Sequence, residues 1–234
     1  MRWFGFMLLV LTGGPDELLE RHIASLDDRP VELKGTVTAT ITTGGQAEIR
    51  GDAVWRAKAE GAELIFSFGH PEYLEDHVSF VDGQVRGQYA RPGQHSELTS
   101  FLLDHEQVMK AGLFGGSLRP DWFLALRSKK VRPKGRKDGL QRYRCSVRNL
   151  TSVDVYLDDD GRHVRTVYRV RKPAGMGRTP VQSARLRDQV TTVTEFFHWE
   201  EQKLTQWRIV YERPSIRWEY VVEVETLRRD FQAP

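Results

Sequence analysis

Residues able to do covalent or metal chemistry are scattered along the 234-residue chain. Cys145 is the only cysteine, which excludes an intramolecular disulfide and a metal site made of cysteines alone. The seven histidines show no spacing typical of a metal site, and the carboxylates fall on the predicted polar faces of strands. No glycine-rich phosphate loop, HExxH or GxSxG motif is present. Unless the fold alone assembles a site, we expect no enzyme activity and no cofactor, with Cys145 a small core residue.

The most charged stretch of the chain is a candidate binding surface. It holds six cations, namely Lys129, Lys130, Arg132, Lys134, Arg136 and Lys137. Such a run contacts anionic lipid, an acidic protein or nucleic acid, or it simply solvates the end of a hairpin. No aromatic residue interleaves it, which disfavours single-stranded nucleic acid. We name Lys129, Lys130, Arg132 and Lys134 as a basic surface and expect no nucleic-acid partner.

Large apolar side chains form the other candidate site. Such side chains can bind an apolar ligand by removing its surface from water, which contributes roughly 0.8 kcal/mol of binding free energy per buried CH₂ group. The residues that we expect to line or close an apolar cavity are Trp55, Phe66, Phe68, Phe101, Leu102, Met109, Leu113, Phe114, Trp218 and Tyr220. They fall on segments with strand periodicity and on segments with helical periodicity. A sheet and a helical cover must therefore bring them together.

The stretch 31–58 predicts a long β-hairpin. Apolar and polar residues alternate on both sides of Gly44-Gly45, which suits a tight turn. Further alternation predicts strands at 62–69, 77–81 and 84–90, the last two joined by Asp82-Gly83. Five strands without a crossover helix are typical of an antiparallel meander.

Helices are expected in two places. Residues 15–26 carry an apolar stripe that begins after Pro15. Residues 97–111 keep helical spacing between Ser96 as N-cap and Gly112 as the stop. The apolar, glycine-bearing loop 113–118 and a short helical turn at 121–126 follow. Because this helix and loop interrupt the meander, they suit a lid over its apolar face.

A second set of strands follows the basic run. Alternation predicts them at 140–149, 153–157, 162–171, 190–199, 204–212 and 216–227. Asp158-Asp159-Asp160-Gly161 is expected to be a turn, and 172–180 has the composition of a loop. The predicted fold class is therefore α+β, mainly antiparallel β, and we expect the apolar faces of 64–68 and 218–222 to lie on one side of a single sheet.

Length and composition suit one domain. A hydrophobic fraction of 39%, a charged fraction of 29% and a mean hydropathy of -0.51 argue against a multi-span membrane protein. The first fourteen residues carry Arg2 and an apolar run from Trp3 to Leu11, too short to span a bilayer but suited to a signal-peptide core. We expect 1–14 to be a signal or an apolar segment that packs on the core, the protein to be exported, and 15–234 to be a single domain.

The order of elements and several motifs resemble the LolA-like proteins, the periplasmic carriers and sorting proteins of outer-membrane lipoproteins. Gly51-Asp52-Ala53-Val54-Trp55 resembles the family's second strand, and Asp82-Gly83 followed by Tyr89 resembles its strand-turn-strand signature. Leu113–Leu118 falls where the family has an apolar Leu/Gly segment. The closing strands at 194–199, 207–214 and 221–230 are similar to those of the sorting proteins.

The resemblance covers 16–231 and implies a curved, incomplete antiparallel β-barrel. In such a half-barrel, helices cover the concave apolar face and acyl chains enter between helices and sheet. One position departs from the family, whose carriers commonly have Arg-Pro after the second strand, with the Arg helping to hold the lid. This chain has Ala57-Lys58 there, and Arg56 would face the other way on a regular strand.

Three functions remain open. We favour a non-enzymatic carrier in the periplasm or cell envelope that shelters the acyl chains of lipids or lipoproteins. The second is a regulatory envelope sensor on the same fold that acts through a protein partner. The third is an adhesion module that uses the basic surface in peripheral contact with a membrane. Ligand occupancy would separate the first two from the third, and a stable protein partner would separate the second from the first.

Overall fold

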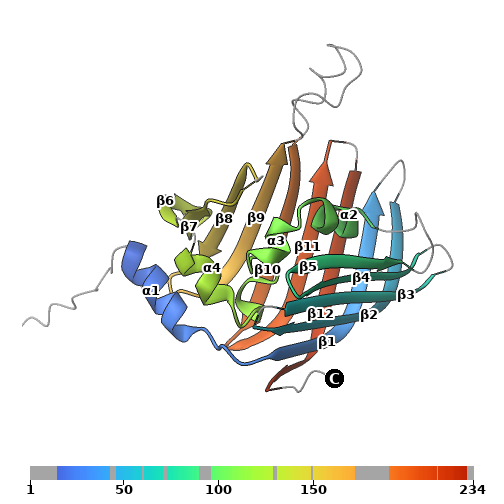
Figure 1. Ribbon diagram of the computed structural model, residues 1–234, viewed down its shortest axis with the longest axis horizontal. Coiled ribbons are helices and arrows are strands. Elements are labelled where there is room, and N and C mark those ends of the chain that lie inside the picture. Colours follow the sequence, from blue (N-terminus) through green and yellow to red (C-terminus); the bar gives the residue numbers. More distant parts are fainter. Residues whose placement is uncertain are drawn as a thin grey trace, which may run out of the picture.

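The computed structural model describes residues 15–42, 46–59, 61–70, 73–89, 96–128, 131–148, 150–171, 190–214 and 216–230. The expectations for 1–14, for the turn at 43–45, for Lys129 and Lys130 and for the loop 172–180 lie outside these residues. Within them, the chain forms a 12-stranded antiparallel sheet and several short helices. The sheet is open and curved, and α2, α3 and α4 lie over its concave face (Figure 1). The predicted fold class is confirmed.

The strands form two meanders that meet in the middle of the sheet. Their order is β5-β4-β3-β2-β1-β12-β11-β10-β9-β8-β7-β6. The first five strands are β1 (Val31–Thr42), β2 (Gln46–Lys58), β3 (Gly61–His70), β4 (Tyr73–Val81) and β5 (Gln84–Tyr89). The remaining strands are β6 (Arg132–Lys137), β7 (Leu140–Cys145), β8 (Ser152–Leu157), β9 (His163–Arg171), β10 (Val190–Glu200), β11 (Lys203–Arg213) and β12 (Ile216–Arg229). Because β1 pairs with β12, the first and the last strand lie side by side in the middle of the sheet.

The helical segment between the meanders crosses the concave face. We call residues 96–128 the cover; it contains α2 (Glu97–Asp104), α3 (Gln107–Lys110), the 3-10 turn η1 (Gly116–Leu118) and α4 (Trp122–Ser128). The other helix, α1 (Pro15–Ser25), lies at one end of the sheet (Figure 1). Since the cover joins β5 at one edge of the sheet to β6 at the other, the chain has to pass over the sheet between them.

Strand register places the predicted apolar faces on the concave side. Trp55 lies opposite Leu33 on β1 and Leu64 on β3, and all three are buried. The rings of Phe66 and Tyr220 stack with their centroids 5.2 Å apart, although β3 and β12 are separated by two strands. The prediction that 64–68 and 218–222 share one side of a single sheet is therefore confirmed.

One local prediction was wrong. Residues 97–111 form two helices because the chain leaves the helical path at His105, whose φ of -125° and ψ of 51° end α2. The predicted cap at Ser96 is confirmed, since its hydroxyl accepts a 3.1 Å hydrogen bond from the Thr99 N–H. The strand β6 was not predicted: it is a fully exposed edge strand that contains Pro133 and Gly135 and shows no apolar alternation. Its pairing with β7 agrees with the solvated hairpin end that the charged run left open.

Other expected features are confirmed. Asp82 and Gly83 both have positive φ in the tight turn between β4 and β5. Cys145 is buried in the core, and Asp158 caps the turn after β8 by accepting hydrogen bonds from the Asp160 and Arg162 N–H groups. Among the described residues, no helix is both long and apolar enough to cross a membrane.

Candidate functional site

The expected apolar site residues all lie in one interior between sheet and cover. The sheet contributes Trp55, Phe66, Phe68, Trp218 and Tyr220, and the cover contributes Phe101, Leu102, Met109, Leu113 and Phe114. None of the ten is more than 6% exposed. The two surfaces are therefore closed on one another, and the side chains of the cover occupy the space above the sheet.

Phe114 of the cover is fully buried against aromatic rings of the sheet. Its ring centroid lies 6.0 Å from Trp55, 5.8 Å from Trp207 and 6.5 Å from Tyr168. Trp55 and Trp207 themselves meet edge to face at 5.4 Å. Such edge-on and tilted aromatic pairs add stabilisation beyond the area that they bury. Phe114 thus fills an aromatic socket built by three strands, β2, β9 and β11.

A carboxylate lies at the floor of this interior, where none was expected. Glu195 of β10 is fully buried, and its Oε1 accepts hydrogen bonds from the Gly115 N–H at 3.0 Å and the Trp207 Nε1–H at 3.1 Å. Its Oε2 lies 2.5 Å from the Tyr168 hydroxyl, which also lies 2.9 Å from the Leu113 carbonyl oxygen. The sheet floor and the cover loop are therefore joined through one carboxyl group.

Burial shifts the ionisation of this group strongly. Removal from water raises the pKa of Glu195 to about 7, although Tyr168, the Gly115 N–H, Trp207 and Arg119 all favour its charged form. Burial and the neighbouring carboxylate hold the pKa of Tyr168 well above its ordinary value. Glu195 is therefore a buried carboxyl group that gains and loses its proton near neutral pH.

Two buried histidines lie beside the cover at the α1 end of the interior. The Trp122 Nε1–H donates to His22 Nε2 at 3.0 Å, and the Ser117 N–H donates to His163 Nδ1 at 3.3 Å. Burial lowers the pKa of His22 to about 4 and, together with the nearby His22, lowers that of His163 well below its ordinary value. Both imidazoles are therefore neutral acceptors that position the cover.

A pocket of about 470 Å³ opens at this end of the molecule. It is lined by His22, Ser25, Leu26, Asp27, Ser117, Asp160, Gly161, Arg162, His163, Trp199, Gln202 and Arg229. Its charged groups are of both signs, and Asp27 is hydrogen-bonded to Arg29. No metal-binding cluster of three or more ligands occurs among the described residues.

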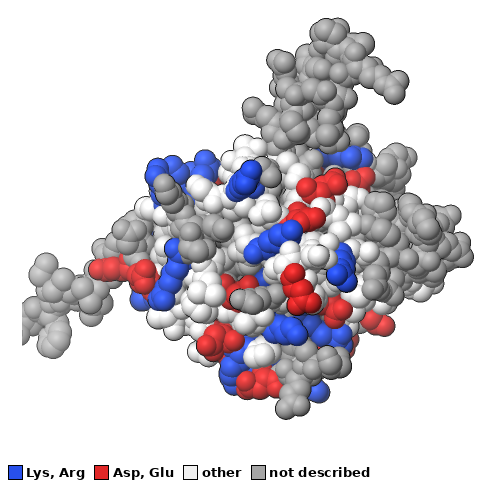
Figure 2. Space-filling model, viewed as in Figure 1, with Lys and Arg blue, Asp and Glu red and all other residues white. Residues whose placement is uncertain are grey.

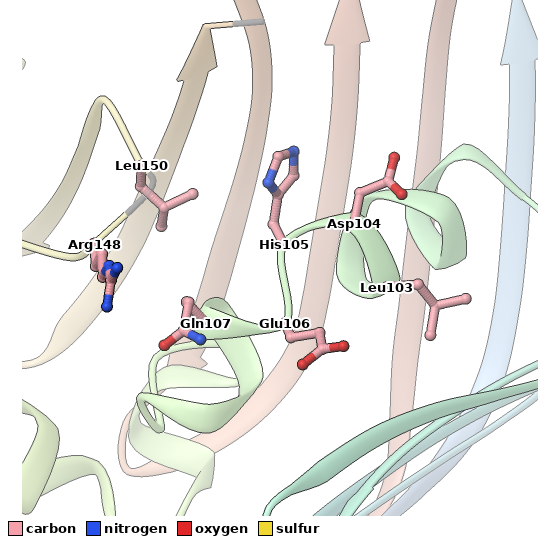
Figure 3. A pocket seen from close by; sticks show the side chains of 7 residues that line it. All are labelled: Leu103, Asp104, His105, Glu106, Gln107, Arg148 and Leu150. Carbon is pink, nitrogen blue, oxygen red and sulfur yellow. The ribbon is translucent and has the colours of Figure 1, made fainter. Parts of the chain in front are cut away.

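Smaller pockets follow the seam between the cover and the sheet. One, of about 210 Å³, is lined by Leu103, Asp104, His105, Glu106, Gln107, Arg148 and Leu150. Figure 3 shows that its two walls come from the α2–α3 junction and from the connection between β7 and β8. A second, of about 80 Å³, lies on the other side of α2, between Phe101, His105 and Tyr211. The seam on this side of the cover is thus less tightly closed than the interior.

Arg119 fastens the cover internally. Its guanidinium is fully buried and binds both carboxylate oxygens of Asp121, at 2.8 and 2.7 Å, and the Met109 carbonyl oxygen at 3.1 Å. It also lies over the Phe80 ring of β4. As expected, Arg56 faces outward, where it pairs with Glu32 and Glu63 on the neighbouring strands.

The described residues of the basic surface, Arg132 and Lys134, lie on the edge hairpin of β6 and β7. Arg132 and Lys134 are exposed on β6, while Arg136 pairs with Asp159. Figure 2 shows Lys and Arg side chains gathered at the upper left, where Figure 1 places β6 and β7. The described part of the predicted surface is therefore accessible to a partner but separate from the apolar site.

The spacing of Glu195 in the sequence predicts that it is buried, although it was not among the expected site residues. Val193 and Phe197 are buried on the concave side, and the period of two puts Glu195 on the same face. A carboxylate in phase with apolar neighbours predicts a buried, hydrogen-bonded group. Arg119 had no comparable signal, because it lies outside any long helix or strand.

Comparison with known proteins gives similarity in structure only. The sequence matches no protein-family model and no curated protein. Similar solved structures include an outer-membrane lipoprotein-sorting protein domain from Vibrio parahaemolyticus, with 9% identity over 93% of both chains and a TM-score of 0.48. A DUF1329 family protein from Desulfovibrio piger is 14% identical over 94% of this chain and 93% of that one, with a TM-score of 0.45. A LolA superfamily protein from Nitrosomonas europaea is 10% identical over 94% of both chains, with a TM-score of 0.43. At these identities the similarity concerns the fold alone.

Proposed function

We propose that this protein is a non-enzymatic carrier in the cell envelope that holds an acyl chain of a lipid or lipoprotein between the concave face of the sheet and the cover. The observation that carries this proposal is a continuous apolar interior made by two separate surfaces. None of the described residues of the cover pairs as a strand with the sheet. A ligand can therefore take the place of the cover's side chains without breaking the sheet.

The polar links between the two surfaces are local. Asp76 of β4 accepts hydrogen bonds from the Ser96 N–H and the Thr99 hydroxyl at the start of α2, and Arg213 of β11 pairs with Glu97. Apart from these links and the hydrogen bonds that Glu195, Tyr168 and His163 make with the cover, the contact between the two surfaces is mostly apolar. Because one apolar contact can be exchanged for another at little cost, an acyl chain that displaces Phe114 would recover roughly 0.8 kcal/mol for each CH₂ group that it buries.

A pair of matched substitutions tests the site. Met109→Gln keeps the length of a fully buried cover side chain but makes it polar, whereas Leu124→Gln changes a side chain that is 53% exposed on α4. We expect Met109→Gln to weaken the binding of a fluorescent fatty acid to delipidated protein by about tenfold or more, since an unpaired amide would face the acyl chain. Leu124→Gln should leave the affinity unchanged.

The unmutated protein provides the first readout of this experiment. If it does not bind the probe after delipidation, the carrier function is refuted. If it binds and Met109→Gln binds equally well, the ligand lies elsewhere. Thermal unfolding of both variants should accompany the titration, so that loss of the fold is not mistaken for loss of the site.

The basic surface is expected to assist delivery at an anionic membrane. Replacing Lys129, Lys130, Arg132 and Lys134 with Gln should weaken binding to anionic vesicles by up to about 1 kcal/mol per charge, in a salt-dependent way. Fatty-acid binding should persist. The control variant carries the same change at four exposed cations outside the run, Arg21, Arg50, Lys58 and Lys203. Equal losses in both variants would mean that net charge alone, and not this hairpin, attracts the protein to the membrane.

A further inference from the structure

We propose that Glu195 and Tyr168 form a proton-operated latch that fastens the loop 113–116 of the cover to the floor of the sheet. The latch is closed when Glu195 carries a proton and loosened when the proton leaves. The hydrogen bonds of the latch do not depend on the carrier function. Only the consequence that a loosened loop admits a ligand rests on the proposed function.

The loop is held at two points by adjacent polar groups. The Gly115 N–H donates to Glu195 Oε1, and the Leu113 carbonyl oxygen lies within hydrogen-bond distance of the Tyr168 hydroxyl. Between these points, Phe114 enters the aromatic socket of Trp55 and Trp207. Loss of either polar contact would therefore loosen the loop on one side of the residue that fills the interior.

The number of available protons shows which protonation state of Glu195 keeps both the Gly115 and the Leu113 hydrogen bonds. The Tyr168 hydroxyl has one proton, but it lies close to two acceptors, Glu195 Oε2 and the Leu113 carbonyl oxygen. When Glu195 is protonated, it donates to the Tyr168 oxygen and Tyr168 donates to Leu113, so each group is satisfied. When Glu195 is ionised, Tyr168 must donate to the carboxylate, and the Leu113 carbonyl keeps only the Gly116 N–H. The Gly115 N–H still donates to the carboxylate, so ionisation releases one of the two points.

The surroundings favour proton uptake near neutral pH. The charged or titratable groups that act on Glu195 and its partner are Tyr168 from β9, Arg119 from the cover and, through Tyr168, Cys145 from β7. Burial outweighs them and raises the pKa of Glu195 from 4.5 to about 7. Because the pKa of the closed state is raised, the stabilisation by the latch is complete below pH 4.5 and is lost as the pH rises through about 7.

The buried histidines act in the opposite direction and in a different range. The pKa of His22 is lowered from 6.5 to about 4, so its stabilising contribution is present above pH 6.5 and is lost as the pH falls toward 4. His163, whose pKa is also lowered and which accepts from the Ser117 N–H, acts in the same direction as His22. A measurement between pH 6.5 and 9 therefore reports mainly on Glu195.

Hydrogen exchange of the loop amides tests the latch. We expect the protection factors of residues 113–118, corrected for intrinsic exchange, to fall about fourfold between pH 6.5 and 9, as a pKa of about 7 in the closed state and 4.5 in the open state requires. Glu195→Gln should make this profile flat, because glutamine stays neutral. Glu97→Gln, which alters the rim contact with Arg213, should keep the pH dependence of the unmutated protein.

Two outcomes would overturn the latch. A flat profile in the unmutated protein would do so without any variant, which matters if Glu195→Gln does not fold. An unchanged pH dependence in folded Glu195→Gln would assign the titration to another group. The carrier function fails independently, when fatty-acid binding is absent at pH values at which the loop exchanges freely.

Discussion

Gly115→Ala is expected to destabilise the protein by about 2–5 kcal/mol. Gly115 has a φ of +86°, where an L-residue is strained. A Cβ atom there would also lie 2.4 Å from Trp55 Cζ2, which is packed against Phe114 and Trp207. The methyl group must push the cover away from the socket or force Trp55 out of its rotamer.

Gly135→Ala provides the matched control for this substitution. Gly135 lies in β6 with a φ of +72°, and a Cβ atom there would meet nothing within 4 Å. Its replacement should therefore cost only the backbone strain, about 1–2 kcal/mol. Urea unfolding of both variants gives the difference, which isolates the contact with Trp55. Equal destabilisation would contradict a tightly seated cover, since it would mean that Trp55 moves aside freely.

The strands were predictable because one face of the sheet is dry and the other wet. Alternation of buried and exposed residues fixes β1, β2 and β12 to within a few residues, and it places Trp55 and Tyr220 on the concave side. The edge strand β6 gives no such signal because all of its side chains face solvent. Its pairing with β7 is set by the short turn at Asp138 and Gly139, both with positive φ, and not by any apolar pattern.

The candidate site was predictable in its apolar part and not in its polar part. Residues such as Phe66 and Phe101 are large and apolar, and their spacing alone assigns them to the interior. Glu195 and Tyr168 meet the cover only through tertiary structure, 80 residues separating Glu195 from Gly115. Hydrogen bonds of this sequence separation depend on the curvature of the sheet and on the path of the cover, which a linear pattern does not contain.

Arg119 illustrates the same limit, because its partners give it a role that its sequence position does not indicate. The family resemblance pointed to an arginine after the second strand as a support for the lid, but that position is occupied by Ala57-Lys58. In this chain the fully buried arginine of the cover is Arg119, which ties residues 109 and 121 to one another and lies over Phe80 of β4. We infer that the cover is held together from within and moves as a unit.

Arg119→Met is expected to destabilise the protein by about 3–5 kcal/mol. Methionine fills a similar volume, but it leaves Asp121 as a mostly buried carboxylate without its guanidinium and removes a donor from the Met109 carbonyl. The double variant Arg119→Met with Asp121→Asn should be less destabilised than Arg119→Met alone, because asparagine carries no charge to be left unpaired. Arg50→Met, at an ion pair with Glu48 in which the arginine is 79% exposed, should change the free energy of unfolding by less than about 1 kcal/mol.

Urea unfolding of these variants, read as a double-mutant cycle for the two partners, separates the charge from the packing. A coupling energy near zero would mean that Arg119 and Asp121 act independently, and the cover would then lack the internal tie that makes it one unit. A large coupling energy, together with unchanged hydrogen exchange in β1 and β12, would place the loss within the cover. The sheet would then persist as a rigid floor beneath a cover that can be loosened separately, which is the mechanical arrangement that an acyl-chain carrier needs.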